Sequence, residues 1–151
     1  MKLTNVAVPT EVISHGSTVA EAFRECLRCN VQGIPFVDSD GCIVGRFSIR
    51  NTIKQYCISK SMIMDADLLG DDLGDLSLQD NDAAKLLSQP VDHFILSEVV
   101  TIHSASPCVK AISLMEKHDT TFLFVVDGET YKGIVNVQAI AKRMMQVNRP
   151  R

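Results

Sequence analysis

An internal repeat constrains the fold of this chain more than any other feature of its 151 residues. When Thr18–Ala22 is aligned with Pro107–Ala111, 89 positions later, apolar residues fall on apolar residues through the following helix and strand. The turn after that strand is one residue shorter in the second copy, so Gly45 is aligned with Gly133. Two copies of about 55 residues therefore account for most of the chain.

The sequence pattern of each copy predicts the same order of secondary-structure elements, β-α-β-β-α. Thr18 followed by Glu21 has capping-box spacing and indicates the start of a helix, and Pro107 indicates a helix start in the second copy. Two strands then meet at an Asp- and Gly-containing turn, and a second amphipathic helix ends the copy. About 55 residues bury too little surface alone, so we expect an α/β (α+β) fold in which two copies pack about a pseudo-twofold axis.

The segment between the copies has a different composition. Seven Asp residues interrupt scattered Leu residues from Met62 to Gln89, and a short helix is predicted near residues 82–87 before Pro90. We therefore divide the chain into repeat 1 (1–60), an acidic linker with a short helix (61–90) and repeat 2 (91–148).

Composition excludes several classes of protein. Apolar residues make up 46% of the chain and aromatic residues 5%, with no Trp, so the core must be mostly aliphatic. A net charge of −3 and few aromatic residues speak against nucleic-acid binding. No apolar run approaches the roughly 20 residues of a membrane span, and five Cys form an odd set. These features predict a cytoplasmic protein with reduced thiols and no membrane partner.

The repeated pattern resembles the cystathionine β-synthase (CBS) domain, and the tandem resembles a CBS pair, or Bateman module. Three marks carry the resemblance in each copy: a small-residue helix start, a strand ending in Val-Asp, and Gly-apolar-apolar before the last helix. The resemblance implies a stand-alone regulatory module that binds AMP, ADP, ATP or a related adenosyl ligand between the repeats and modulates an unknown partner protein. It implies no catalytic residues and no required cofactor.

The family's nucleotide signature is Gly, two residues, Ser or Thr, two residues, then Asp. Copy one matches it from Gly45 to Asn51, where Ser48 would cap the helix beside a phosphate, Arg50 would add charge, and Asn51 would reach the ribose. Asn51 replaces the carboxylate of the signature, which predicts weaker binding. By the family's usual geometry, the base would lie against backbone near Ile13 and Ser14 and near Gly33, Ile34 and Pro35.

Copy two departs further from the signature. Asn136 can still cap the helix, but Ala139 stands where the carboxylate is required and cannot hydrogen-bond a ribose. We therefore expect no standard nucleotide site in copy two. A purely structural reading also remains open for copy one, where Ser48 would be a helix cap and nothing more.

Other chemical signals are weak. Cys26 and Cys29 form a C-x-x-C pair, but Cys26 occupies a core position, and the other Cys residues supply no second pair for zinc. No nucleophile has a partnered base, and no phosphate loop of the Gly-Lys-Ser type is present, so we do not expect an enzyme.

We also expect a homodimer, because the last helix of each copy carries more apolar residues than one small sheet needs. The alternative function is a ligand-free scaffold for dimerisation or interaction. The apolar residues of these helices are Ile49, Ile53, Tyr56 and Cys57, followed by Ile58, Met62 and Ile63, in copy one, and Ile140, Ala141, Met144, Met145 and Val147 in copy two.

Overall fold

The computed structural model describes residues 1–71 and 80–148. Part of the acidic linker, residues 72–79, therefore lies outside the described residues. The elements follow the chain in the order η1 (Leu3–Asn5), β1 (Ile13–Ser14), α1 (Val19–Cys29), β2 (Gly33–Val37), β3 (Ile43–Ser48), α2 (Ile49–Cys57), α3 (Lys60–Met64), η2 (Ala66–Leu68), α4 (Asp80–Ser88), η3 (Val91–Phe94), β4 (Thr101–Ile102), α5 (Cys108–Lys117), β5 (Phe122–Asp127), β6 (Thr130–Asn136) and α6 (Val137–Val147).

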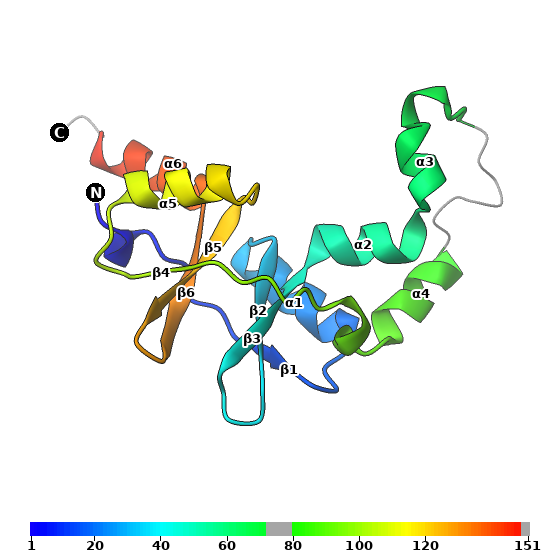
Figure 1. Cartoon of the computed structure of the whole chain (residues 1–151), viewed down its shortest axis with the longest axis horizontal. Coiled ribbons are helices and arrows are strands. Elements are labelled where there is room, and N and C mark those ends of the chain that lie inside the picture. The colour runs from blue at the N-terminus through cyan, green and yellow to red at the C-terminus, as the bar shows by residue number, and fades with distance from the viewer. Residues whose placement is uncertain (72–79, 149–151) are drawn as a thin grey trace.

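The two copies form two sheets of identical topology, as the repeat predicts (Figure 1). In the first sheet β1 is parallel to β2 and β2 is antiparallel to β3, and in the second β4, β5 and β6 pair in the same way. The β-α-β-β-α order of each copy is therefore confirmed, and the short helix of the linker is present as α4.

The helix starts follow the sequence signals in most places. Thr18 accepts a hydrogen bond from the Glu21 N–H at 3.1 Å and so caps α1. Helix α5 differs, because Pro107 is its N-cap residue rather than its first helical residue. Pro107 is extended there because it pairs with Lys2 of the N-terminal segment, and the next amide donates to the Met1 carbonyl.

The segments that precede the two copies cross over to the opposite copy. Val8 pairs with Ile134 of the second sheet through hydrogen bonds of 2.8 and 2.9 Å. Leu96, in the segment before the second copy, pairs with Arg46 of the first sheet through hydrogen bonds of 2.8 and 3.0 Å. Leu96 lies 88 positions after Val8, and Ile134 lies 88 positions after Arg46, so the two pairs are equivalent in the repeat. The pseudo-twofold relation therefore includes these segments.

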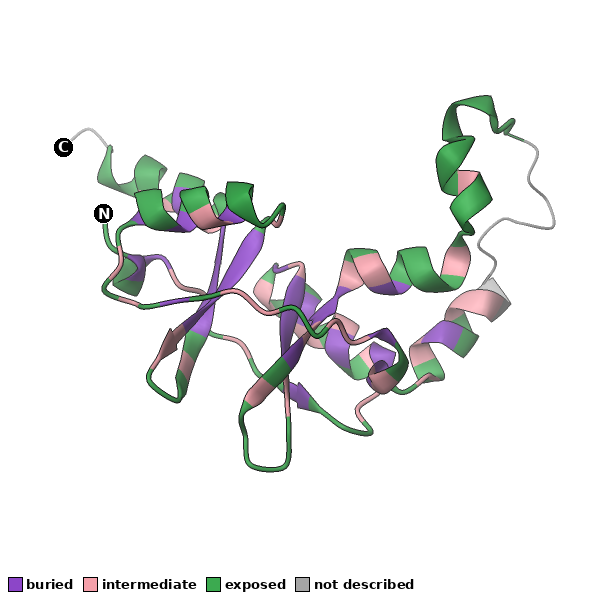
Figure 2. Ribbon diagram, viewed as in Figure 1, coloured by how far each residue is buried: buried purple, intermediate pink, exposed green. Residues whose placement is uncertain are grey.

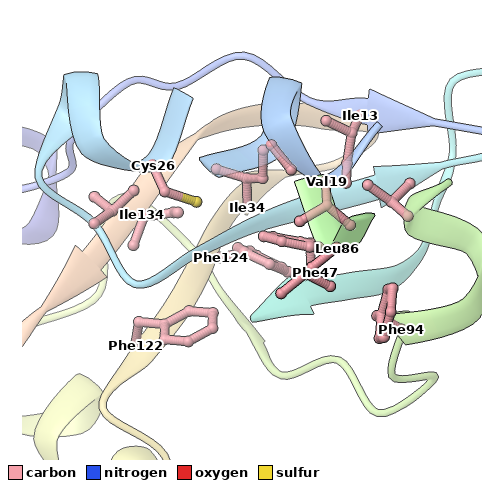
Figure 3. Close-up of a cluster of buried hydrophobic side chains, with 13 residues drawn as sticks. Ile13, Val19, Cys26, Ile34, Phe47, Leu86, Phe94, Phe122, Phe124 and Ile134 are labelled. Atoms are coloured by element: carbon pink, nitrogen blue, oxygen red, sulfur yellow. The ribbon is translucent and has the colours of Figure 1, made fainter. Parts of the chain in front are cut away.

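The crossed segments contribute to both hydrophobic cores. Leu3 and Val6 are buried in the core of the second copy, and Val91 and Phe94 are buried in that of the first. The first core also takes side chains from both sheets, so the two copies share one packed interior (Figures 2 and 3). Members of this shared core include Val19, Ile34, Phe47, Phe94, Phe122, Phe124 and Ile134.

One part of the chain stands away from this body. Helix α3 and the following turn η2 extend beyond the end of α2, and the N-terminal segment lies at the opposite end of the molecule, near α5 and α6 (Figure 1). The arm is mostly exposed, with Met64 and Leu68 each 83% exposed (Figure 2). None of the described helices is long and apolar enough to cross a membrane.

Candidate functional site

The predicted phosphate and ribose residues lie together at the N-terminus of α2. Ser48 is the N-cap residue, and its hydroxyl accepts the Asn51 N–H at 3.2 Å. Arg50 is exposed in the first turn of the helix. The side-chain amide of Asn51 donates to the Phe94 carbonyl at 3.2 Å. Ser48 therefore caps α2 as the sequence indicates, while Asn51 holds the crossed segment against this helix.

The predicted base-contacting residues are divided between two places. Gly33 is paired with Ser48 in the strand register, so β2 brings it to the start of α2. Ile13 and Ser14 pair instead with the far end of β2, and Ser14 lines a separate open groove of about 710 Å³ beside the first hairpin. Ile34 and Pro35 are buried.

The ring of Phe122 covers Gly33. A Cβ atom built on Gly33 would lie 2.7 Å from Cζ of Phe122 and 2.3 Å from the Phe47 carbonyl oxygen. Only glycine fits between these two groups. Because Phe122 and Gly33 occupy equivalent positions in the two copies, a missing side chain in one copy accommodates a large one in the other.

We call the space between α2 and residues 93–98 the first cleft. Gln55 donates to the His93 carbonyl at 3.0 Å, and Nε of Arg46 donates to the Glu98 carbonyl at 2.9 Å. Burial lowers the pKa of the Arg46 guanidinium, which lies 5.8 Å from the centre of the Phe122 ring. Next to this cleft, a cavity of about 20 Å³ lies beside Arg46 and Phe122, with room for roughly one water molecule; β3, β5 and the residues around them line it, and α2 does not.

We call the equivalent space between α6 and residues 5–9 the second cleft, and it is open. A cavity of about 360 Å³ lies there, lined by that segment, by Asn30 at the end of α1, and by residues of α6 with its cap. This volume is within the range of small-molecule sites. The structure therefore places a much larger space at copy two, where the signature is weaker, than beside Arg46 and Phe122.

Two substitutions distinguish the second cleft from the first. Asn51, which holds the crossed segment of the first cleft, corresponds to Ala139, which has no side chain to reach residues 5–9. Gln55, which makes the second such hydrogen bond, corresponds to Arg143. The two side-chain hydrogen bonds that hold the crossed segment in the first cleft therefore have no equivalent at these positions of the second cleft.

Sequence reasoning missed the positive charge of the second cleft. Lys142 and Arg143 line the cavity, whereas its lining contains no Asp or Glu. Lys142 and Arg143 follow Ala139 by three and four residues and therefore lie on the same face of α6. This spacing could have identified them as residues of the second cleft.

Other polar clusters have structural roles. Asp127 accepts hydrogen bonds from the amide and the hydroxyl of Ser104, which lower the pKa of its carboxyl group, and lies 3.1 Å from Nε2 of His103. The serine faces the carboxylate and not the imidazole, so this set is not an activated nucleophile. It closes the loop between β4 and α5.

The C-x-x-C pair does not have the features of a reactive dithiol. Cys26 is fully buried, and burial raises the pKa of its thiol to about 12. Burial also raises the pKa of Cys29. A thiol with a raised pKa is a poor nucleophile near neutral pH. Among residues 1–71 and 82–148, no group of three or more His, Cys, Asp and Glu side chains is positioned to hold a metal ion.

Comparison with known proteins agrees with this architecture. Residues 91–146 match the family model described as the CBS domain. A search of curated proteins finds no significant match.

Solved CBS structures align with nearly the whole chain. The CBS domain pair of protein MJ0100, in complex with 5′-methylthioadenosine and S-adenosyl-L-methionine, is 16% identical with a TM-score of 0.65, and the match covers 98% of each chain. The CBS-domain containing protein ATU1752 from Agrobacterium tumefaciens is 15% identical with a TM-score of 0.65, covering 95% of this chain and 99% of that one. The CBS domain of a membrane protein from Sphaerobacter thermophilus is 14% identical with a TM-score of 0.65, covering 94% and 86%. At these identities the similarity establishes the fold.

Proposed function

Since the second copy is a CBS domain and the whole chain has the fold of a CBS-domain pair, we propose that this protein is a regulatory module that binds an adenosyl ligand and modulates a partner protein. The ligand is AMP, ADP, ATP or a related adenosyl compound. MJ0100, which has the same fold, is complexed with two adenosyl compounds, and this supports the ligand class.

The cavity of the second cleft is the observation that carries this proposal. It has a volume of about 360 Å³, it lies between a crossed segment and the N-terminus of α6, and polar side chains surround it. Helix N-termini favour anionic groups through free N–H groups and the helix dipole. We therefore assign the ligand to the second cleft in the first instance.

The first cleft is a second candidate site. Ser48, Arg50 and Asn51, with Ile13, Ser14 and Gly33–Pro35, form the site proposed from the sequence signature. A ligand there must displace the hydrogen bond between Asn51 and the Phe94 carbonyl, and a base against Gly33 must displace the Phe122 ring. Binding in this cleft therefore carries a reorganisation cost that the second cleft lacks.

Calorimetry with AMP, ADP, ATP, NAD and S-adenosylmethionine tests the function. We expect one site per chain for at least one of these compounds, together with a rise in melting temperature that follows ligand concentration. Failure of all five to bind at millimolar concentration would contradict ligand sensing and favour the alternative function, a ligand-free interaction scaffold.

Apolar side chains at the helix surface support a homodimer. Met144, Met145 and Val147 of α6 are 50%, 73% and 58% exposed, and Ile53 and Tyr56 of α2 are 39% and 38% exposed. Exposed apolar surface of this kind is typical of protein–protein contacts, and Met side chains adapt to a partner.

Light scattering over a dilution series tests the dimer against the 16.6 kDa monomer mass. Met145→Glu should shift the chain toward monomer. Leu27→Glu on α1, where Leu27 is also 73% exposed, is the matched control and should not change the mass. A monomeric mass for the unmodified chain at all concentrations would refute the dimer.

A further inference from the structure

The second cleft is positively charged in an acidic protein. The chain has a net charge of −3, yet Lys142 and Arg143 line the cavity and no carboxylate does. The cation-to-anion balance around this space is therefore opposite to that of the molecule as a whole. A site with this balance favours anions over neutral molecules and cations.

A buried polar group adds a donor to these two cations. Asn136 lines the cavity and is only 2% exposed. Its side-chain oxygen accepts the Ala139 N–H at 2.8 Å, so its NH₂ group is the part of the side chain that can donate to a ligand. Asn136 lies at the N-terminus of α6, where the helix dipole also favours negative charge.

The ribose end of the cleft has no equivalent donor or acceptor. Ala139 occupies the position of the carboxylate in the family signature and has no polar side-chain atom. The ribose–carboxylate contact of the signature is therefore missing, and the charged side chains that line the cavity are the two cations.

We infer that the second cleft selects its ligand by the phosphate chain, so that nucleoside di- and triphosphates bind and adenosine or S-adenosylmethionine does not. This inference rests on the proposed function, since it names the ligand class of the same site. Lys142 and Arg143 neutralise the phosphates, and the Asn136 NH₂ group donates a further hydrogen bond. S-adenosylmethionine carries a positive sulfonium group, which the two cations repel.

Calorimetry with ATP, ADP, adenosine, S-adenosylmethionine and inorganic tripolyphosphate tests the inference. We expect ATP to bind at least about tenfold more tightly than adenosine, because charge-assisted hydrogen bonds are the stronger ones. ATP affinity should fall as salt is raised, since these side chains are partly exposed. Replacing both cations, as Lys142→Ala with Arg143→Ala, should lower ATP affinity at least about tenfold.

Two further variants control this result. Lys110→Ala with Lys117→Ala removes the same charge from exposed positions of α5 that do not line the cavity, and should change ATP affinity less than about twofold. Ala139→Asp restores the ribose-binding carboxylate of the family signature and should raise the affinity for adenosine more than that for ATP, because the added negative charge opposes the phosphates. Equal melting temperatures of the unliganded variants would show that each one is folded.

The outcomes separate this inference from the proposed function. Adenosine or S-adenosylmethionine binding as tightly as ATP overturns phosphate selection and leaves the adenosyl-sensing function standing. Tripolyphosphate binding as tightly as ATP supports phosphate selection but overturns an adenosyl-specific function. Absence of binding by all five compounds overturns both.

Discussion

Gly45→Ala tests the crossing of the segment before the second copy over the first sheet. A Cβ atom on Gly45 would lie 2.5 Å from Cγ2 of Ile95 and 2.9 Å from the Leu96 carbonyl oxygen. The backbone of Gly45 does not have a positive φ, so the added methyl group acts only through these contacts. To make room, residues 95 and 96 must move away from β3.

The size of the effect follows from what that movement breaks. Leu96 exchanges two backbone hydrogen bonds with Arg46, and each is worth about 0.5–1.5 kcal/mol net. Overpacking a well-packed site costs about 1–3 kcal/mol, which is the same range. We expect Gly45→Ala to lower the free energy of unfolding by about 2 kcal/mol. For a chain of this size, that corresponds to a fall of about 4–8 °C in melting temperature.

Urea and thermal unfolding of two variants measure this effect. Gly70→Ala makes the same chemical change where no atom lies within 4 Å of the added Cβ, and should be close to neutral. In a double-mutant cycle, Ile95→Ala should recover part of the loss in the Gly45→Ala background by removing the methyl group at 2.5 Å. Equal stability of Gly45→Ala and Gly70→Ala would refute the close approach of this segment to β3.

Three other changes test the cap, the shared core and the pH dependence. Asn136→Ala and Ser48→Ala each remove the N-cap of a helix, and each should lower the free energy of unfolding in urea by about 1 kcal/mol. Only Asn136→Ala should weaken ligand binding. Equal loss of binding in both variants would contradict the assignment of the ligand to the second cleft. Phe122→Ala removes a ring that is 7% exposed and should cost about 3–5 kcal/mol; a loss below about 1 kcal/mol would mean that the copies do not share a core. Hydrogen bonds from Arg28 lower the pKa of Glu25 from 4.5 to about 2, so Glu25 stabilises the fold above pH 4.5 and loses this effect as the pH falls toward 2. Glu25→Gln should therefore show a smaller drop in melting temperature between pH 6 and pH 3 than the unmodified chain, and identical drops would refute this assignment.

The order of elements could be predicted because local signals set it. The Thr18 cap, the turn residues and the helical spacing of apolar residues all act within a few positions, and the repetition of the pattern supports each assignment. Burial of Cys26 agrees with its predicted core position, and Met115, which is aligned with Cys26 in the second copy, is buried as well.

The state of the two clefts could not be predicted, because it depends on distances between segments far apart in the chain. The signature at Gly45–Asn51 does not reveal that the Asn51 amide donates to the Phe94 carbonyl. Nor does Ala139, read as a lost ribose contact, reveal that residues 5–9 leave a cavity beside it. Residues 1–10 have no helical or strand periodicity, so their place against the second sheet was also hidden.

The crossed segments have a consequence for how the two copies are connected. The segment before β1 completes the core of the second copy, and the segment before β4 completes that of the first. The two repeats have therefore exchanged their N-terminal segments, which is the arrangement of a domain-swapped dimer within one polypeptide. Pro9 lines the cavity of the second copy, and Ile13 begins the first sheet only four residues later. The cavity of the second copy and the sheet of the first are therefore joined by only a few residues of one continuous chain.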